Sequence, residues 1–302
     1  MAEPPPPPPH PATDSRPVHP LVTVAEKVFI PDGIPLQEAL SRTTHLAIGA
    51  HPDDIEFMAF DGIALCHNHP TMWFGAVVCT DGSGSPLPAN TPNISPQEMC
   101  QLRQREQQRA ATLGNYSFVA QLGYSSQQIQ HPLHSTLVEE LTSIVETCRP
   151  QILYTHNPAD KHPTHLRVLV AVVEALHRAS PQARPQQLIG CEVWRDLDWL
   201  PDQHKIRMDV SGHEPLARQL LSCFPTQIHG GKRYDLAVPG RRQAHATFSD
   251  PWQPDTSTQV ILGMDLTPLI GAPAVRLLEH TDWLIEQFHH EVRTALQQTL
   301  SC

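Results

Sequence analysis

The stretch that decides the fold is His45-Leu46-Ala47-Ile48-Gly49-Ala50-His51-Pro52-Asp53-Asp54. A short apolar run such as the one that opens it is typical of a buried strand. From Asp53 to Cys66 the apolar residues recur at helical spacing, which predicts a helix directly after that strand. The polar residues His51, Asp53 and Asp54 are therefore predicted to stand where a strand passes into a helix.

Strands and helices alternate further along the chain. We expect strands over 71–78, 117–122 and 151–155, and helices over 95–114, 133–148 and 163–179. Ser95 as N-cap, Pro96 at the first helical position and Gly114 as the stop delimit the first of these helices. Alternating strands and helices predict βαβ units, so the expected fold class is α/β, a Rossmann-like, mostly parallel sheet flanked by helices.

The C-terminal part is less regular and predicts an α+β portion. Here we expect strands over 188–194 and 205–210, helices over 213–223, 234–248 and 273–298, and loops over 225–234 and 249–258. At the other end, residues 1–20 are expected to form a disordered tail, because six consecutive prolines favour polyproline II over hydrogen-bonded structure.

Composition excludes several classes of partner. The 302 residues hold 21 Lys and Arg against 31 Asp and Glu, a formal charge of −10, which argues against nucleic acid and against an anionic membrane surface. No run of about 18 apolar residues suggests a membrane span, and no signal-peptide pattern opens the chain. The seven cysteines are odd in number and form no CxxC pair, which indicates reduced thiols and a cytoplasmic location.

The first motif that carries chemistry is His51-Pro52-Asp53-Asp54. In open α/β sheets, ligand sites lie beyond the carboxyl ends of the strands, which is where this motif is expected. Side chains of adjacent aspartates point in different directions, so one can bind a metal while the other faces a substrate or water. The alternative is that one aspartate serves only as a helix N-cap, which leaves His51 unexplained.

The second motif is Asp160-Lys161-His162-Pro163-Thr164-His165. It also follows a strand and opens a helix, with Pro163 suited to the first helical position. A helix N-terminus disfavours a charged imidazolium, and a neutral ring is the form that binds metal. The alternative is two surface histidines at the end of a loop.

Brought together in one sheet, the two motifs supply a metal site. His51, Asp54 and His165 make a three-ligand set with an open position for water, the arrangement of catalytic zinc. Asp53 and His162 are left at the rim, where a catalytic site needs a base for the water and a group for the developing oxyanion.

These motifs resemble those of the LmbE-like zinc de-N-acetylases, the family that contains the PIG-L enzymes acting on N-acetylglucosaminyl compounds. Ala50-His51-Pro52-Asp53-Asp54 is similar to the first family motif and Asp160–His165 to the second. Thr80-Asp81-Gly82 and Arg103-Gln104-Arg105-Glu106 are similar to family segments between them, and the resemblance extends over about residues 43–270.

The resemblance implies a role for each matching residue. His51, Asp54 and His165 would bind one Zn²⁺ per chain, with Fe²⁺ or another divalent ion as the alternative. Asp53 would be the general base and His162 would assist the oxyanion, while Arg103 and Asp81 would reach the substrate. For Arg103, a helix-surface arginine paired with Glu106 is the alternative.

One position departs from the family pattern: Thr164 stands where the second motif usually has an aspartate. That aspartate supports a ligand histidine from behind in family members, so its loss concerns the orientation of the ring and the rate more than metal binding.

The expected function is therefore removal of an acetyl group from an N-acetylated amino sugar by metal-activated water. The partner is a small amino-sugar conjugate. A single LmbE-like α/β catalytic domain is expected over 21–302, with a C-terminal extension of about 196–302 that contributes to the substrate pocket. The sequence leaves the oligomeric state open, a homo-oligomer included.

Two rival functions remain. The chain could be a metal-containing carbohydrate-binding domain with impaired catalysis, to which Thr164 points, although a binding module has no need of Asp53. A His-x-Asp pair with a distant His also fits the facial triad of non-haem iron oxygenases, but that triad usually sits on a double-sheet barrel.

Two further features are expected to be structural. Residues 82–86 (Gly-Ser-Gly-Ser-Pro) could cradle a phosphate but are expected to form a plain loop, since no lysine accompanies them. His245 and the pair Arg241-Arg242 could line a polar pocket, but we expect them on a solvated helix face.

Overall fold

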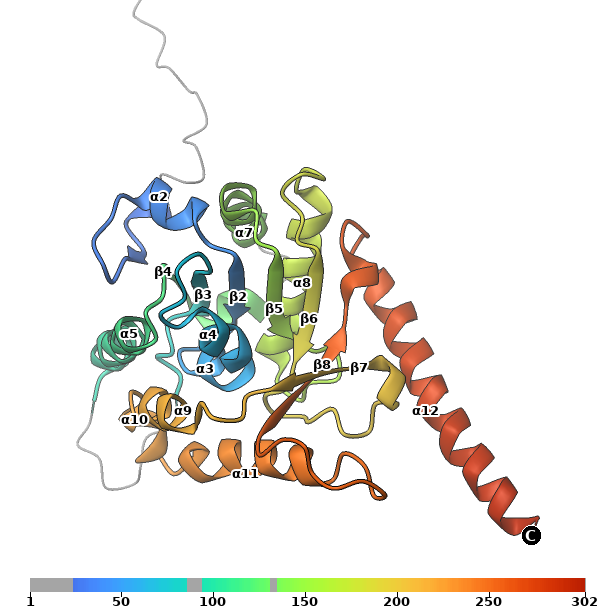
Figure 1. Cartoon of the computed structure of the whole chain (residues 1–302). Helices are drawn as coiled ribbons and strands as arrows, with labels where there is room; N and C mark the ends of the chain where they lie inside the picture. Colours follow the sequence, from blue (N-terminus) through green and yellow to red (C-terminus); the bar gives the residue numbers. More distant parts are fainter. Residues whose placement is uncertain (1–23, 86–93, 131–134, 302) are drawn as a thin grey trace, which may run out of the picture.

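The computed structural model describes residues 24–85, 94–130 and 135–301. The proline-rich tail expected over 1–20, the last residue of the loop expected over 82–86 and the start of the helix expected from 133 lie outside the described residues. Within them the chain forms one eight-stranded sheet covered by helices (Figure 1). The α/β class with a mostly parallel sheet is confirmed.

The sheet has the order β1-β4-β3-β2-β5-β6-β8-β7. Its five central strands, β4 to β6 in that order, run parallel, whereas β1, β8 and β7 are antiparallel to their neighbours. The strands are β1 (Val28–Phe29), β2 (His45–Gly49), β3 (Phe74–Thr80), β4 (Phe118–Tyr124), β5 (Ile152–His156), β6 (Gln187–Cys191), β7 (Lys205–Asp209) and β8 (Val260–Asp265).

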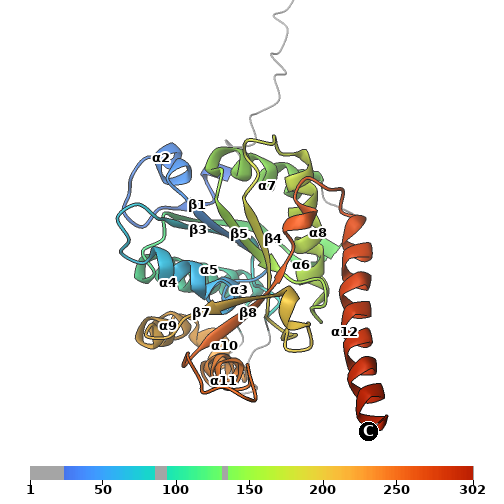
Figure 2. The same ribbon diagram turned by 45° about the vertical axis from the view of Figure 1, so that its right-hand side comes forward.

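Helices cover both faces of the sheet and one of its ends. They are α2 (Leu36–Ser41), α3 (Asp54–Met58), α4 (Phe60–Cys66), α5 (Pro96–Leu113), α6 (Ser126–Gln130), α7 (Ser135–Cys148), α8 (Pro163–Arg178), α9 (Glu214–Leu221), α10 (Pro225–Ile228), α11 (Tyr234–Thr247) and α12 (Arg276–Leu300). Helices α9 to α11 gather at one end of the sheet, while α12 runs away from the body with the C-terminus at its far end (Figure 2).

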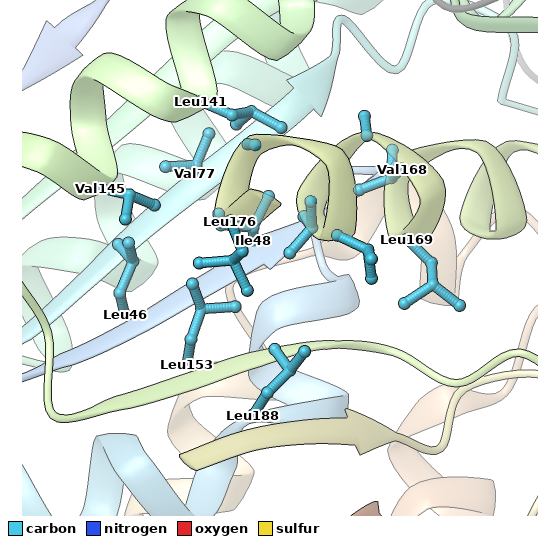
Figure 3. Close-up of a cluster of buried hydrophobic side chains, with 14 of the residues drawn as sticks. Leu46, Ile48, Val77, Leu141, Val145, Leu153, Val168, Leu169, Leu176 and Leu188 are labelled. Atoms are coloured by element: carbon cyan, nitrogen blue, oxygen red, sulfur yellow. The ribbon is translucent and has the colours of Figure 1, made fainter. Parts of the chain in front are cut away.

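The alternation of side chains along β2 explains the two covered faces. Leu46 and Ile48 point to the face packed by α7 and α8, in a buried apolar cluster that Figure 3 shows. Ala47, between them, belongs to a second cluster formed with α3, α4 and α5. Because both faces of β2 are packed against apolar groups, its sequence is a continuous apolar run, as expected for the centre of a parallel sheet.

The sheet contains a topological switch point. From β2 the chain proceeds to β3 and β4 on one side, and then crosses to β5 on the other side of β2. The carboxyl ends of β2 and β5 therefore lie side by side with connections that diverge, which is where open α/β sheets bind ligands. Both sequence motifs follow these two strands.

Several elements differ from the sequence expectations. The helix expected over 53–66 is two helices, because Ala59 leaves the helical conformation at φ −110° and ψ 24°. Part of the expected loop 225–234 is the short helix α10. Strand β8, which joins β6 to β7, was not expected. The capping box at Ser95 and the start of α8 at Pro163 are as expected.

No helix in the described part of the chain is long and apolar enough to cross a bilayer.

Candidate metal centre and active site

Three side chains from the two motifs converge at the switch point. The Nδ1 atom of His51 lies 3.1 Å from Oδ2 of Asp54 and 3.1 Å from Nε2 of His165. The same Asp54 oxygen lies 3.3 Å from Nε2 of His165. A tetrahedral ion with ligand distances of 2.0–2.1 Å holds neighbouring ligand atoms about 3.3 Å apart, so the three atoms fit one such ion. Two nitrogens and one carboxylate oxygen are also ligands that zinc takes.

A fourth histidine, which the sequence analysis did not single out, lies beneath this triad. His156 ends β5, is fully buried and stacks on the His165 ring with centroids 3.9 Å apart. Its Nε2 accepts a hydrogen bond of 2.9 Å from the Ala50 amide, so that lone pair is engaged. The position was visible in the sequence, since a histidine at the carboxyl end of a central strand satisfies the same rule that selected His51.

Asp160 orients the ring of His165. Its Oδ2 lies 3.4 Å from Nδ1 of His165, on the side of the ring opposite the triad. The carboxylate is itself fixed by the amides of His162 and Trp194. A carboxylate behind a ligand histidine sets its tautomer and angle. Asp160 stands in the position for such support, while the buried Thr164 hydroxyl, where the aspartate was expected, accepts a hydrogen bond from Gln130.

His162 is held as a neutral hydrogen-bond donor. It caps helix α8, and its Nδ1 accepts a bond of 3.2 Å from the Thr164 amide. Burial, together with the neighbouring His51 and His165, lowers the pKa of His162 to about 4. A neutral ring that accepts at Nδ1 carries its proton at Nε2. This arrangement leaves an N–H to donate and no free lone pair for a metal, although His162 clusters with His51 and His165.

Asp53 lies beside the triad but outside it. Its backbone has φ 96°, a region that favours glycine and is tolerated by Asp and Asn. The strained peptide is held from both sides, because Arg103 donates to the Pro52 carbonyl and the Asp53 amide donates to Gln107. Strain of this kind clusters at functional sites.

The two adjacent aspartates have opposite electrostatic environments. Burial raises the pKa of Asp53 to about 8, against the opposing charge of Arg103. Burial acts the same way on Asp54, but His165 and His51 outweigh it and hold the pKa of Asp54 well below its usual range. Asp54 is thus a permanent anion suited to a cation, whereas Asp53 can exchange a proton near neutral pH.

Arg103 is not a helix-surface residue. It is 1% exposed, and its guanidinium lies 3.4 Å from Oδ2 of Asp53. The alternative pairing with Glu106 is wrong, because the Glu106 carboxylate instead accepts bonds from the amide and hydroxyl of Thr226 in α10. The apolar spacing of α5 could not show this, since its buried face is polar and meets the loop after β2.

Asp81 is placed differently from the other candidates. Its Oδ1 accepts bonds from the amide and hydroxyl of Ser83, which fixes the turn after β3. It is not among the described residues that line the cavity at the triad, whereas Arg103 is. Contact of either residue with a substrate stays a prediction.

The expectation of a solvated helix face for the 241–245 region is wrong. Arg242 is 3% exposed and donates to the carbonyls of Glu56 and Phe57 at the end of α3. His245 is buried against Glu192, with 2.9 Å between Nε2 and Oε1. Sequence periodicity missed this because these polar side chains pack inward, Arg242 on α3 and His245 on Glu192.

A cavity of about 430 Å³ opens above the triad. The catalytic candidates on its wall are His51, Asp53, Asp54 and His162. The remaining wall combines loop residues with Trp194, Lys232 and Tyr234, so both the segment after β6 and the C-terminal part of the chain contribute to it. The ammonium of Lys232 lies 4.7 Å from the Trp194 ring centroid. A polar floor beside an aromatic wall suits a small polar molecule.

The chain is similar to one protein family and to several solved structures. Residues 46–176 match the family model described as PIG-L, GlcNAc-PI de-N-acetylase. No curated protein sequence matches the chain. Among solved structures, N,N'-diacetylchitobiose deacetylase from Pyrococcus horikoshii is similar at 14% identity and a TM-score of 0.60, covering 80% of this chain and 89% of that one.

Two other solved structures share the fold. The 4-carboxy-2-hydroxymuconate hydratase from Pseudomonas putida has 16% identity and a TM-score of 0.58, covering 74% of this chain and 95% of that one. A deacetylase of the teicoplanin biosynthesis pathway, solved with teicoplanin, has 14% identity and a TM-score of 0.52, covering 74% and 97%. At these identities the likeness establishes the fold.

Proposed function

We propose, from the premise that residues 46–176 belong to the PIG-L (LmbE-like) family, that this chain is a metal-dependent hydrolase that removes the acetyl group from an N-acetylated amino sugar. The observation that carries the proposal is the separation of roles at the switch point. Three ligand atoms lie within 3.3 Å of one another, and a proton-exchanging acid and a neutral N–H donor stand beside them on one cavity wall.

His51, Asp54 and His165 would hold the ion, and we propose Zn²⁺, with Fe²⁺ as the alternative that the same donor atoms accept. When bound, a divalent ion of this kind acidifies water and polarises a carbonyl oxygen. The chain's own contribution is to fix the three donor atoms, with Asp160 behind His165 and the His51 amide donating to Asp54.

Asp53 acts as the general base and then as the general acid. As a carboxylate it takes a proton from water while the water oxygen attacks the acetamide carbonyl carbon. It then returns that proton to the nitrogen as the carbon–nitrogen bond breaks, and acetate and a free amine leave. A carboxyl with a pKa near the working pH suits both steps, and that of Asp53 is about 8.

His162 stabilises the negative charge that develops on the carbonyl oxygen. Its proton stands at Nε2, because Nδ1 accepts from the Thr164 amide, and the low pKa keeps the ring a neutral donor. A donor fixed before the reaction begins costs no reorganisation during it.

The cavity supports a sugar-sized substrate. Trp194 is 36% exposed and offers an aromatic face close to the polar groups, an arrangement that suits a sugar ring with an apolar face and polar edges. The family description and the names of two structural neighbours also concern removal of acetyl groups. We place the reaction in the cytoplasm, since the six described cysteines are free thiols.

A second candidate function is hydration of a carbon–carbon double bond, because one similar fold belongs to a hydratase. The same base and metal site would serve it. The family match favours amide hydrolysis.

The deciding experiment measures amine release. The metal-loaded protein is incubated with a panel of N-acetylglucosaminides, and free amines are detected with fluorescamine while acetate is measured in parallel. Equal release of amine and acetate from at least one glycoside supports the proposal. Metal binding without release from any of them contradicts it and favours the carbohydrate-binding module, and oxygen consumption would favour an iron oxygenase.

A further inference from the structure

A second, smaller pocket adjoins the active-site cavity. It has a volume of about 170 Å³ and lies under helix α11. Trp194 and Tyr234 line both spaces, with ring centroids 6.4 Å apart in an edge-to-face arrangement. The two rings therefore form a wall that the cavity and the side pocket share. At this size the pocket holds one substituent and not a whole ligand, since ligand sites usually measure about 300–1,000 Å³.

The walls of this side pocket are mainly apolar. They are formed by Phe57, Val193, Ala237, Val238 and Ile261 together with the two shared aromatic rings. An apolar group buried there gains about 25 cal/mol for each Å² removed from water. Such walls favour an alkyl or aryl body over a second sugar.

One buried cation lines the same pocket. Arg242 is 3% exposed, and its Nη2 donates to two carbonyl oxygens, while its Nε has no hydrogen-bond partner in the described residues. No carboxylate forms an ion pair with it there. Burial lowers the pKa of Arg242 to about 9, which leaves it charged at neutral pH. The nearby charge of Glu192 and the two carbonyl oxygens compensate this buried charge only in part, and an anion that reaches Arg242 removes part of the remaining cost.

The other charged groups around the pocket are already engaged. Glu192 accepts bonds from the Leu197 amide and from His245, so its hydrogen bonds go to other groups, although its charge still acts on Arg242. Arg241 donates to the carbonyl of Val193. With two arginines against one glutamate, the lining carries a net positive charge that suits a single negative group.

We propose that the side pocket receives the aglycone of the substrate, and that this aglycone has an apolar body ending in an anionic group that pairs with Arg242. The inference rests on the proposed function for the identity of the sugar end. The pocket and its charge are independent of it, so they can be tested separately.

The binding test uses 3-phenylpropanoate and the matched neutral 3-phenylpropan-1-ol as probes, titrated calorimetrically into the metal-loaded protein. Binding of the acid at the metal centre would survive a substitution confined to the side pocket, so the variants described next distinguish the two sites. We expect the acid to bind at least about tenfold more tightly than the alcohol, a difference of ~1.4 kcal/mol.

Variants locate the binding. Val238→Trp places a large ring in the pocket while Arg242 stays in the chain, and it is expected to abolish binding of the acid. Leu236→Trp adds a ring to an exposed position of the same helix and is expected to leave binding unchanged. Arg242→Met is expected to remove the preference for the acid; should that variant fail to fold, Val238→Trp still decides. Equal binding of the two probes, no binding of either, or binding that survives Val238→Trp overturns the proposal.

A kinetic test connects the pocket with the reaction. The value of kcat/KM is compared for the methyl glycoside of N-acetylglucosamine and for a glycoside whose phenylpropyl aglycone ends in a carboxylate. We expect a preference of about tenfold or more for the second, lost in Val238→Trp and kept in Leu236→Trp. No hydrolysis of either glycoside contradicts the proposed function alone, whereas hydrolysis of both at equal rates contradicts the side-pocket assignment alone.

Discussion

Asp53 owes its role to a backbone conformation that few residues adopt. Its positive φ turns the side chain away from the metal triad, although the next residue in the chain, Asp54, belongs to that triad. The two carboxylates therefore occupy different environments, although the Cα atoms of the two residues are only about 3.8 Å apart, as across any trans peptide. One remains an anion, and the other has its pKa raised to about 8 by burial.

The first prediction concerns Asp53→Asn. Asparagine tolerates the positive φ and keeps the shape of the side chain, so the loop should survive, but it cannot take a proton. We expect amine release to fall by about 10²–10⁴ with an unchanged metal content, which elemental analysis and the fluorescamine assay measure together. Asp202→Asn, an exposed position paired only with Lys205, is the control. Full activity in a metal-loaded Asp53→Asn protein would exclude Asp53 as the base.

The second prediction separates two roles for His162. If its Nε2 proton serves the oxyanion, His162→Ala should lower kcat by about 10²–10³ and leave the metal in place. KM should change little, because the interaction forms only as charge develops. If His162 is instead a fourth metal ligand, the bound metal itself will be lost, and elemental analysis of the purified variant reveals that outcome.

The third prediction concerns protons released by metal binding. Against the effect of burial, the carboxylates of Asp54 and Asp160 raise the pKa of His165 to about 9, so the ring is protonated at pH 7 in the metal-free protein. A metal needs its free lone pair and must displace that proton, so affinity should rise with pH up to about 9 and at least about one proton should be released per ion. Calorimetry in two buffers of different ionisation enthalpy counts the protons, and a count of zero would contradict His165 as a ligand.

Among the elements, helix α5 supports the site although it contributes no metal ligand. Gln107 accepts from the Asp53 amide and donates 2.8 Å to Oε1 of Glu56, which also accepts from the hydroxyl of Tyr116. All these groups are buried, so each bond that is lost leaves an unsatisfied polar atom. The polar face of α5 thus holds the loop that carries Asp53.

The fourth prediction tests this support. Gln107→Met removes both bonds at similar volume and is expected to lower the free energy of unfolding by about 1–3 kcal/mol. It should also lower kcat more than it changes metal content, since Asp53 loses its fixed position. Gln104→Met, one turn earlier on the exposed face of α5, is the matched control and should change neither. An unaltered urea midpoint and kcat for Gln107→Met would show that the loop is held by other contacts.

The sequence predicted those elements whose patterning is local. Central strands read as apolar runs, and Ser95-Pro96 and Pro163 marked helix starts that the structure has at the same residues. The approach of His51 and His165 to each other was predictable, because each follows a strand that ends at the switch point, and such strand ends converge in any such sheet. The positive φ of Asp53 and the break at Ala59 carry no local signal, since neither position holds glycine or proline.

The burial of the two arginines could not be predicted from the local sequence, for a different reason. Arg103 and Arg242 lie on helices that look solvated by composition. Each is buried against backbone carbonyl oxygens of a distant segment, which is the loop after β2 for Arg103 and helix α3 for Arg242. The partners of Arg242, at Glu56 and Phe57, are 186 and 185 positions away. Contacts at such separations follow from tertiary packing, which single-sequence periodicity does not contain.

At the scale of the whole molecule, the parallel sheet places the chemistry and the C-terminal part encloses it. Strands β8 and β7 extend the sheet antiparallel beyond β6, and the chain between and around them forms α9 to α11 over the site (Figures 1 and 2). The proposed metal ligands lie at or before residue 165, whereas the cavity wall also includes later positions such as Lys232 and Tyr234. With the proposed function, we expect the chemistry to depend on the first of these parts of the chain and substrate selectivity on the second.

The two halves of helix α12 are expected to contribute differently to the stability of the protein. Only its first half packs on the body, where Leu277 and Leu284 are buried and Phe288 contacts Trp199. We predict that Leu284→Ala costs about 2–5 kcal/mol, because it leaves a cavity in that contact. Ending the chain after Phe288 should alter the free energy of unfolding by no more than about 0.5 kcal/mol, since the residues removed are almost all exposed. Urea denaturation of both variants measures these changes in the free energy of unfolding, and amine release is a second measurement. If the truncation lowers the free energy of unfolding as much as Leu284→Ala does, the distal half of α12 is buried in solution. A second copy of the chain is a partner that could cover it.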